Sequence, residues 1–566
     1  MLPTLLDVQA SVGLALVSHL FYANYEPSAP TVLAVYLVGS LSYLFLAATS
    51  HPSFSPFDWI VSLAVLQTAY TASLLSSIAA YRLFFHRLRS FKGPSSLALS
   101  KWAWVPTDLA GQRPAKVTSL HATYGDVVRV GPRELSINDV GAINQILGGQ
   151  SACHKGPWYT AAHGGKGPRS LSLHVTIDTG DHRSRRRIWD AGFSVAALRS
   201  YEAQLRQTTR KLLTQLDART GGEVAMDQWC QFYAFDVMSE LGFSRSFDLL
   251  GKGSFSKPIE LLEGAMQAIM VLGAVPYLSA VARVAPNPIK DFEDFTEEAL
   301  RERVGRSAEK KRGDDDRADI FTHLLGEDKA TGWKHTWNEL NADAGLVVVA
   351  GSDTTSSVLA MVIFHLVKHP DVLERVRKEL YDVFGHDYEE EDHDLDFDKL
   401  AKECVWLNAV LNETMRLYPP VASGLQRESP SGASSSLVLN LKHSASTVVV
   451  PPATILSVPT TALHHDPRNF SPRPDAFRPE RFVDPSKEER FEAAAFMPFG
   501  HGPTGCVGKK LAWMEMRLML ANFIGRFDAN FAPGFDPEKY VRVCIKDTFT
   551  MTRTAPIRVV LSRRAR

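Results

Sequence analysis

The first 81 residues contain no lysine or arginine, and long stretches of them carry no charged side chain at all. Residues 31–50 form a run of twenty uncharged residues, which is the length that crosses the hydrocarbon core of a bilayer as a helix. Residues 60–81 form a second run, and residues 8–25 a shorter third one that includes Gln, His and Asn. A buried core helix would explain one such run. Two long runs in tandem favour two or three membrane-spanning helices.

A basic cluster ends the uncharged region. Its members are Arg82, His86, Arg87, Arg89 and Lys92. Positive charge stays on the cytosolic side of a membrane, so the rest of the chain is expected in the cytosol. A cleaved signal peptide is disfavoured, because such a peptide starts with a basic region that this chain lacks. We therefore expect a membrane anchor at 1–93, a stiff break at Gly93-Pro94 and a folded domain at 94–566.

Composition excludes several classes of protein. Lysine plus arginine (62) equals aspartate plus glutamate (62), so no net field favours nucleic acid as a partner. With 45% hydrophobic and 22% charged residues, the chain has the composition of a globular protein rather than a disordered one. The five cysteines are far apart and form no CxxC pair, which argues against a disulfide framework or a zinc ribbon.

Helical periodicity dominates after residue 95. It predicts long helices at 181–198, 226–249, 337–368, 370–384, 398–417 and 508–527. Strand-like runs are few and short, at 127–130, 447–450 and 557–561. Residues 309–319 and 387–396 are expected as solvated loops, and 430–446 as a loop or a short hairpin. The fold class that we expect is mainly α with small β-sheets, preceded by N-terminal transmembrane helices.

One cysteine lies in a glycine-rich loop directly before a helical pattern. Glycines at 500, 502, 505 and 508 surround Cys506. Glycine lets backbone approach a flat ligand where a side chain would clash. A cysteine at a helix N-terminus is favoured as the thiolate by the positive end of the helix dipole. A thiolate is the form that a soft axial ligand of iron must take.

This loop resembles the haem-binding loop of the cytochrome P450 superfamily, whose motif positions are matched by Phe499, Gly502, Cys506 and Gly508. Three more segments match motifs of the family in the right order along the chain. Residues 350–355 (Ala-Gly-Ser-Asp-Thr-Thr) resemble the oxygen-activation motif, residues 413–416 the ExxR motif and residues 479–482 the PERF motif. The resemblance is to fungal, membrane-anchored members and covers about residues 90–560.

The resemblance implies the cytochrome P450 fold, haem b (iron protoporphyrin IX) as the cofactor and Cys506 as the axial thiolate ligand of its iron. Such a thiolate pushes electron density onto the iron and favours O–O bond cleavage. Phe499, Gly502 and Gly508 would border the haem. Thr504 departs from the pattern, since the family usually has arginine there to meet a haem propionate. Fungal members often share this departure, which leaves one propionate contact open.

Asp353 and Thr354 interrupt the apolar stretch of the expected helix at 337–368. A buried carboxylate there is costly unless it is paired or has a function. The resemblance implies that both residues deliver protons during oxygen activation, with the Thr354 hydroxyl holding oxygen and water. Structural roles are the alternative: Thr354 would bond to its own helix, and Asp353 would pair with a nearby base. Gly351 would loosen the helix where oxygen must fit.

Three further residues are expected to have a structural role. Glu413 and Arg416 are three positions apart and therefore share one helix face. With Arg481 of the PERF motif, they are implied to form an ion-pair cluster near the cysteine loop. Breaking such a buried network typically costs about 3–5 kcal/mol.

The carboxylates of a haem need basic partners, and the resemblance implies three candidates. His182 and Arg186 are four positions apart on one expected helix, and Arg427 is the third candidate. Charge-assisted bonds from these side chains to haem propionates would be strong ones.

A solvated basic face is the alternative interpretation of that helix. Arg183, Arg185 and Arg187 lie beside the two candidates in the sequence. Such a face could dock an acidic reductase that delivers electrons.

The expected function is that of a haem monooxygenase. It would insert one oxygen atom from O2 into a hydrophobic small molecule, with electrons from NADPH delivered by a separate flavoprotein reductase, since no flavin domain fits in this length. The expected place is the endoplasmic reticulum membrane, with the catalytic domain on the cytosolic side. Residues 153–176 would cover the substrate pocket, and the fungal type of the resemblance points to secondary metabolism.

Two other functions remain open. One is a haem-thiolate isomerase or peroxygenase, and the other is a non-enzymatic membrane haem protein. Asp353 and Thr354 favour the monooxygenase, because enzymes that need no proton relay often lose such residues. Consumption of NADPH in the presence of a reductase and a substrate would separate the three functions.

Overall fold

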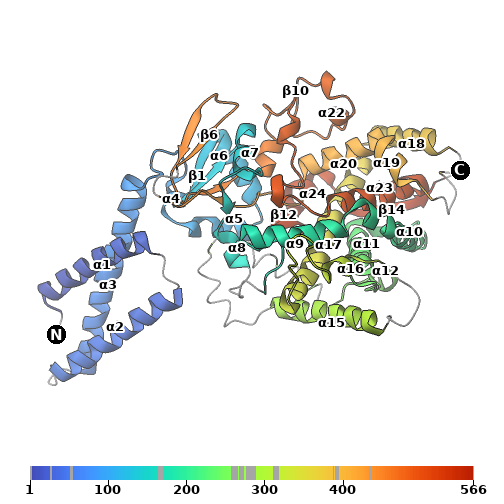
Figure 1. Cartoon of the computed structure of the whole chain (residues 1–566). Helices are drawn as coiled ribbons and strands as arrows, with labels where there is room; N and C mark the ends of the chain where they lie inside the picture. Colours follow the sequence, from blue (N-terminus) through green and yellow to red (C-terminus); the bar gives the residue numbers. More distant parts are fainter. Residues whose placement is uncertain are drawn as a thin grey trace.

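The computed structural model describes residues 3–25, 29–50, 55–162, 170–256, 288–309, 318–385, 394–432 and 436–564, together with Glu260, Met266, Met270, Gly273, Val275 and Tyr388. Three apolar helices lie at one end of the molecule, and a larger, mostly helical body follows them (Figure 1). The loops expected at 309–319 and 387–396, and the pocket cover expected at 153–176, lie partly outside the described residues.

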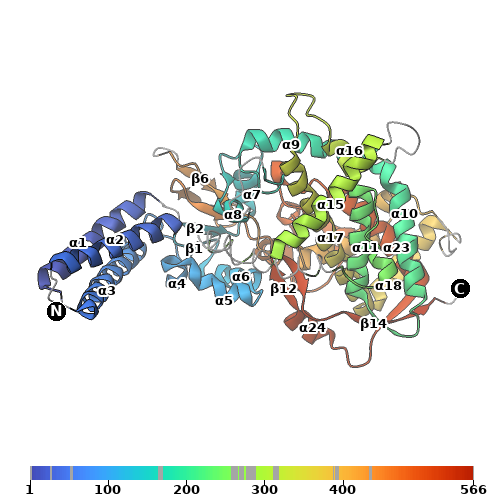
Figure 2. The ribbon, with the colours of Figure 1, turned by 90° about the horizontal axis from the view of Figure 1, so that it is seen from below.

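The three N-terminal helices form one bundle, as Figure 2 shows. They are α1 (Leu5–Asn24), α2 (Ala29–Ser50) and α3 (Pro56–Ala80), and α3 ends in a π-helical turn at Tyr81–Phe85. Side-chain hydrogen bonds join α1 to α3 at Ser11–Leu66, Ser18–Tyr70 and His19–Ser77, and α2 to α3 at Ser40–Gln67 and Tyr43–Ser62. These pairs make α1 parallel to α3 and α2 antiparallel to it.

All three helices of the bundle are long and apolar enough to cross a membrane, and their side chains are largely exposed. The short run at 8–25 therefore forms a candidate span like the two longer runs. A fourth helix of the described chain also has this length and hydropathy, but most of it is buried inside the body. Burial by protein marks that helix as a core element rather than an anchor.

The segment after the bundle is in close contact with the body. Leu88 is fully buried in a hydrophobic cluster that includes Leu135 and Ile137. The backbone N–H of Arg129 donates to the Lys92 carbonyl at 2.8 Å. A Cβ at Gly93 would overlap the carbonyl oxygen of Arg129, so this position requires glycine. Packing of the body thus begins upstream of Gly93-Pro94, and the expected domain boundary at 93/94 stays a prediction.

Helices make up most of the body. Those of ten or more residues are α6 (Arg113–Tyr124), α9 (Thr179–Gly192), α10 (Val195–Asp217), α11 (Met226–Phe243), α15 (Pro288–Glu309), α17 (Trp337–Lys368), α18 (Pro370–Phe384), α20 (Val405–Leu417) and α23 (Lys509–Arg526). Shorter ones are α4 (Ser95–Leu99), α5 (Val105–Leu109), α7 (Val140–Leu147), α8 (Pro157–Ala162), α12 (Leu249–Lys252), α16 (Ile320–Leu324), α19 (Phe397–Lys402), α21 (Thr460–His464), α22 (Glu480–Val483) and α24 (Pro537–Cys544).

The strands of the described chain form small sheets. One has the order β1-β2-β8-β5-β3 (Val127–Gly131, Glu134–Ile137, Ile455–Ser457, Arg427–Glu428, His154–Lys155) and another the order β11-β14-β4 (Phe527–Phe531, Arg558–Arg563, Glu223–Ala225). Three strand pairs complete the set: β6-β7 (Leu437–Asn440, Thr447–Val450), β9-β10 (Phe470–Ser471, Arg490–Phe491) and β12-β13 (Ile545–Thr548, Thr550–Arg553). The prediction of a mainly α fold with small sheets is confirmed.

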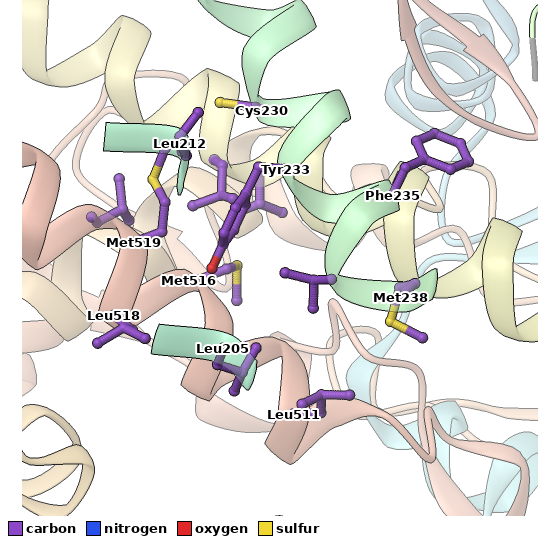
Figure 3. Close-up of a cluster of buried hydrophobic side chains, with 14 of the residues drawn as sticks. Leu205, Leu212, Cys230, Tyr233, Phe235, Met238, Leu511, Met516, Leu518 and Met519 are labelled. Atoms are coloured by element: carbon purple, nitrogen blue, oxygen red, sulfur yellow. The ribbon is translucent and has the colours of Figure 1, made fainter. Parts of the chain in front are cut away.

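The core surrounds α17, which packs lengthwise against α11. Figure 3 shows a cluster of buried hydrophobic side chains from this core. In it, Leu205 and Leu212 of α10 meet Tyr233 of α11 and Met516 and Met519 of α23. All five side chains are buried. The removal of such apolar side chains from water is the main favourable contribution to the free energy of folding. This core fixes the position of α17, which contains residues 350–355, relative to α23, which begins directly after the cysteine loop.

Several expected elements differ in detail from the observed ones. The predicted helix at 181–198 is two helices, because α9 ends at Gly192 and Ser194 caps α10 by accepting from the Ala197 N–H. The helix predicted at 226–249 ends at Phe243, where Ser244 adopts a left-handed conformation. The helix predicted at 398–417 is interrupted between α19 and α20. Residues 430–446 include β6 of a hairpin with β7, one of the two expected alternatives.

Candidate functional site

Cys506 lies in the loop between Phe496 and the first turn of α23. Its backbone N–H donates to the Phe499 carbonyl at 2.9 Å, which closes the loop. Gly500 and Gly502 have φ of 71° and 70°, a region that side-chain-bearing residues rarely adopt. A Cβ at Gly502 would also overlap the carbonyl oxygen of Leu147 at the end of α7. The glycines thus shape the loop and let α7 approach it.

The Cys506 side chain is exposed to an internal cavity rather than to the outside of the molecule. Burial raises the pKa of its thiol, whereas the backbone N–H groups of Gly508 and Lys509 and the charge of Arg186 lower it. These N–H groups belong to the N-terminal turn of α23, where the helix dipole favours negative charge. The net pKa of the thiol is raised, and these N–H groups offset part of the cost of burying a thiolate.

The cavity has a volume of about 360 Å³, within the usual range of small-molecule sites. Its walls are mostly apolar, with Leu346, Val347, Ala350 and Val358 supplied by α17. Phe499 and Gly508 border it on the side of the cysteine loop. The cavity thus has one thiol group, that of Cys506, facing a mostly apolar space.

Thr354 lines this cavity from α17, and its hydroxyl donates to the Ala350 carbonyl at 2.7 Å. This is the bond to its own helix that the structural alternative requires, and it leaves the hydroxyl free to accept from a ligand. Gly351 does not loosen the helix as expected, since α17 is continuous there. Instead, a Cβ at Gly351 would overlap Met238 of α11, so this glycine permits close packing of the two helices.

Asp353 does not line the cavity. Its Oδ2 accepts a hydrogen bond from the Thr550 hydroxyl on β13. Burial raises the pKa of the Asp353 carboxyl, while the Thr550 bond and the nearby charge of Arg553 lower it. The expected base is thus only an electrostatic neighbour, and the direct partner is a hydroxyl that the sequence analysis did not single out.

Arg427 and Thr504 contact each other. The Arg427 Nη2 donates to Thr504 Oγ1 at 2.5 Å, and its Nη1 donates to the hydroxyl of Tyr159 at 3.2 Å. Arg427 is buried and borders the cavity. Thr504 therefore helps to hold the Arg427 side chain at the wall of the cavity.

His182 and Arg186 both border the cavity from α9. Arg186 Nη1 donates to the Gly505 carbonyl at 2.6 Å and thereby holds the residue before Cys506. Its Nε forms an ion pair with Asp190. Burial and the charges of Lys155 and Arg186 lower the pKa of His182 to about 3.

The interpretation of α9 as a solvated basic face is wrong in its main part. Arg185 is fully buried and contacts Asp343 at 3.3 Å, and Arg187 pairs with Asp328 at 2.5 Å. Only Arg183 of the three is exposed. The helix periodicity was compatible with exposure, but the carboxylates that neutralise these arginines come from segments that are distant in sequence.

Two basic residues at the cavity were missed by the sequence analysis. Lys155 is buried, and burial together with the charges of Arg427 and Arg185 lowers its pKa to about 7. Burial likewise lowers the pKa of His174 to about 3, and its Nε2 has no hydrogen-bond partner in the described part of the chain. No sequence signal marks either residue, because Lys155 lies in the two-residue strand β3 and His174 in a turn.

The charges around the cavity fit an anionic ligand. Six basic side chains line it: Lys155, His174, His182, Arg186, Arg427 and His501. Among its described lining residues the only carboxyl group is Glu515, and burial raises the pKa of that group well above its ordinary value. A flat apolar molecule with carboxylate groups would meet the charges of Arg186 and Arg427 and the neutral N–H donors of the histidines. Haem has this chemistry, and with the facing thiol the residues present fit it.

The three residues expected to form an ion-pair cluster are in contact. Arg416 donates two hydrogen bonds to the Glu413 carboxylate at 2.7 and 2.8 Å, and Arg481 donates one at 3.3 Å. All three side chains are fully buried. Arg416 also donates to the carbonyl of His464, whose Nε2 accepts from the Met497 N–H. The cluster is thereby joined to the start of the cysteine loop.

An aromatic pair separates the cavity from a smaller one of about 80 Å³. Trp158 and Phe549 stack with ring centroids 4.9 Å apart, and Phe549 borders both cavities. Lys101 and Trp104, which follow the anchor in the chain, line the smaller cavity on its other side. Trp158 lies in the segment expected to cover the substrate pocket.

Comparisons with known proteins agree with this geometry. A model of the family described as cytochrome P450 matches residues 95–546. A cytochrome P450 monooxygenase of Eupenicillium brefeldianum is 34% identical over 87% of this chain and 94% of its own length. Tryprostatin B 6-hydroxylase of Aspergillus fumigatus is 31% identical over 88% of this chain and 85% of its own length. The crystal structure of a cytochrome P450 haem domain has a TM-score of 0.66 at 18% identity, covering 80% of this chain and 93% of that one.

Proposed function

Because the chain belongs to the cytochrome P450 family and is a monooxygenase of that family, we propose that Cys506 is the thiolate ligand of its haem iron. The observation that carries this proposal is the position of the Cys506 side chain at the wall of a largely apolar cavity with basic groups along it. When bound there, haem b supplies the redox chemistry that activates O2.

The residues around the cavity have separate roles in this proposal. Arg427 and His182 hold the carboxylates of the haem, Arg427 as a cation and His182 as a neutral N–H donor, because both line the cavity and burial lowers the pKa of His182. The Lys155 ammonium donates to the carbonyls of Leu173, His174 and Thr176 and adds positive charge nearby. Arg186 holds the cysteine loop through the Gly505 carbonyl. Glu413, Arg416 and Arg481 have a structural role, since they are fully buried and lie outside the cavity.

The substrate in this proposal is a lipophilic small molecule. The cavity walls consist mainly of apolar and aromatic side chains. The hydroxyl groups that we assign to oxygen chemistry are those of Thr354 on α17 and Thr550 on β13. Electrons come from NADPH through a separate flavoprotein reductase. One relative carries the name tryprostatin B 6-hydroxylase, which supports hydroxylation of a secondary metabolite as the reaction.

The experiment that tests this function measures the full chain with a reductase in membranes. Substrate candidates are screened by the spin-state shift of the haem spectrum, and product is then compared with NADPH and O2 consumed. Thr354→Ala is expected to keep the haem spectrum and the spin shift but to lower product per NADPH roughly tenfold, because a hydroxyl that orders protons at the cavity is lost. The missing electrons should be recovered as hydrogen peroxide.

Thr354→Ser is the matched control, because it keeps the hydroxyl and should couple NADPH to product nearly as well as the wild type. Equal coupling in wild type and Thr354→Ala would reduce Thr354 to a helix residue. Failure of the wild-type chain to consume NADPH with any substrate would contradict the proposed function itself.

We further propose that the three-helix bundle anchors the enzyme in the endoplasmic reticulum membrane, with the body in the cytosol. An odd number of spans places the start of α1 on the luminal side, opposite the basic residues after α3. The protein should resist alkaline carbonate extraction from microsomes. In sealed microsomes, a tag ahead of α1 should be protected from protease and a tag at the C-terminus digested. Digestion of both tags would support two crossings instead of three.

A further inference from the structure

The carboxyl group of Asp353 is cut off from the cavity by its position on α17. Thr354 and Thr355 line the cavity, whereas Asp353 does not. The residue lies on the side of the helix that packs against the hairpin β12-β13. Burial raises the pKa of this carboxyl, so it keeps a proton at higher pH than an ordinary aspartate does. A proton on Asp353 therefore needs an intermediate group to reach the cavity.

Thr550 is the group that contacts both. It is the first residue of β13, it is buried, and it lines the cavity. Its hydroxyl donates to Asp353 Oδ2. Since a hydroxyl has one donor and two acceptor sites, the same oxygen can also accept a hydrogen bond.

The hairpin turn fixes the direction of the Thr550 side chain. Thr548 pairs directly with Thr550, so Phe549 alone makes the turn, with φ of 82°. Non-glycine residues rarely adopt this conformation, and it persists only where the surroundings impose it. Here the stacking of Phe549 on Trp158 holds the turn against the cavity.

Further hydrogen bonds hold β13 against α17. The Ser357 hydroxyl donates to the Met551 carbonyl at 3.0 Å, and Arg553 donates to Ser357 at 2.9 Å. Arg553 also faces Asp227 of α11 at 3.5 Å, which neutralises its charge. The contact between Thr550 and Asp353 is therefore one of several polar contacts between β13 and α17, and the other contacts hold it in place.

We propose that Thr550 is a positioning residue for proton delivery, through which the Asp353 carboxyl is connected to the cavity. This inference rests on the proposed function and assigns Thr550 a part in it. The step requires the Thr550 hydroxyl to rotate from Asp353 Oδ2 toward a water in the cavity, so that the protonated Asp353 carboxyl donates to the Thr550 oxygen. Thr550 then passes its hydroxyl proton to the water and takes the Asp353 proton, which leaves a carboxylate and a hydronium ion. A hydronium ion formed in the solvent later returns one proton to Asp353 and becomes water.

The test uses three variants of the full chain. Thr550→Val removes the hydroxyl at constant shape, and Thr550→Ser keeps it. Thr552→Val is the matched control, because Thr552 is on the same strand, contacts Thr548 and does not line the cavity. Thr550→Val should lower product per NADPH by about tenfold and change its pH profile, whereas Thr550→Ser and Thr552→Val should behave like the wild type.

A second measurement needs neither substrate nor reductase. The infrared C=O stretch of protonated Asp353, identified by its loss in Asp353→Asn, should shift to higher frequency in Thr550→Val but not in Thr552→Val. An unshifted band, wild-type coupling in Thr550→Val, or equally poor coupling in Thr550→Ser would each overturn the inference. Failure of the proposed function looks different, because wild type and all variants alike would then form no product.

Discussion

Replacement of Cys506 by alanine is expected to abolish the red-shifted Soret band of the reduced, carbon-monoxide-bound protein and to leave little haem bound. The side chain faces the cavity at the N-terminal turn of α23, where N–H groups of Gly508 and Lys509 favour the thiolate. Alanine offers no ligand to iron, and the remaining contacts to the haem would be those of the cavity walls and the bases. Haem content per protein and the carbon monoxide difference spectrum measure the effect.

The other four cysteines are the controls for this prediction. Cys153 and Cys544 are half-buried, and Cys230 and Cys404 are buried in the core. Alanine at any of them should keep the band, although the two core positions should lower stability. A normal band in Cys506→Ala, or its loss in Cys544→Ala, would contradict the assignment of the ligand.

Glu413→Ala is expected to prevent accumulation of folded protein. It leaves Arg416 without its two carboxylate bonds and Arg481 without one, in a site with no access to water. Removal of one partner from a buried ion pair costs about 3–5 kcal/mol. The free energy of unfolding of a domain is typically about 5–15 kcal/mol, so the loss is a large part of it. The yield of folded protein and the midpoint of thermal unfolding measure this.

Glu538→Ala is the matched control for the loss of a carboxylate that pairs with a cation. Glu538 contacts Lys368 at 2.6 Å, but it is 79% exposed. Exposed pairs contribute about 0–1 kcal/mol, so this variant should unfold nearly as the wild type does. If Glu413→Ala and Glu538→Ala had the same small effect, the cluster would have no structural importance.

Elements with local end signals could be predicted from the sequence almost to the residue. Helices α17 and α18 have the predicted bounds, because Thr336 and Glu339 form a capping box and Pro370 starts the second helix. The break between α9 and α10 was missed, since Ser194 lies in a continuous helical pattern. Ser194 caps α10, and the neighbouring Phe193 is buried in the core, a tertiary contact that a helical pattern does not reveal.

The candidate site could be predicted where its residues are close in sequence and not where distant segments meet. The loop around Cys506 occupies about fifteen residues, so its glycines and its cysteine are visible together. The Thr550 partner of Asp353 is 197 positions away, and the Asp343 partner of Arg185 is 158 positions away. Neither carboxylate contact has a periodicity or a spacing that a sequence could reveal. The alternative interpretation that placed Arg185 on a solvated basic face was wrong for this reason.

The contact between residues 88–93 and β1 restricts the orientational freedom of the enzyme. A body on a long, unstructured tether would sample many heights and tilts above the bilayer. Here Leu88 is part of the core, and the Arg129 side chain donates to the Arg82 carbonyl at the end of α3. The tilt of the bundle then sets the tilt of the body, and the smaller cavity beside Lys101 keeps a fixed distance from the lipid. If the bundle crosses a membrane and the substrate is lipophilic, as proposed, this fixed height would give the enzyme access to molecules dissolved in the bilayer.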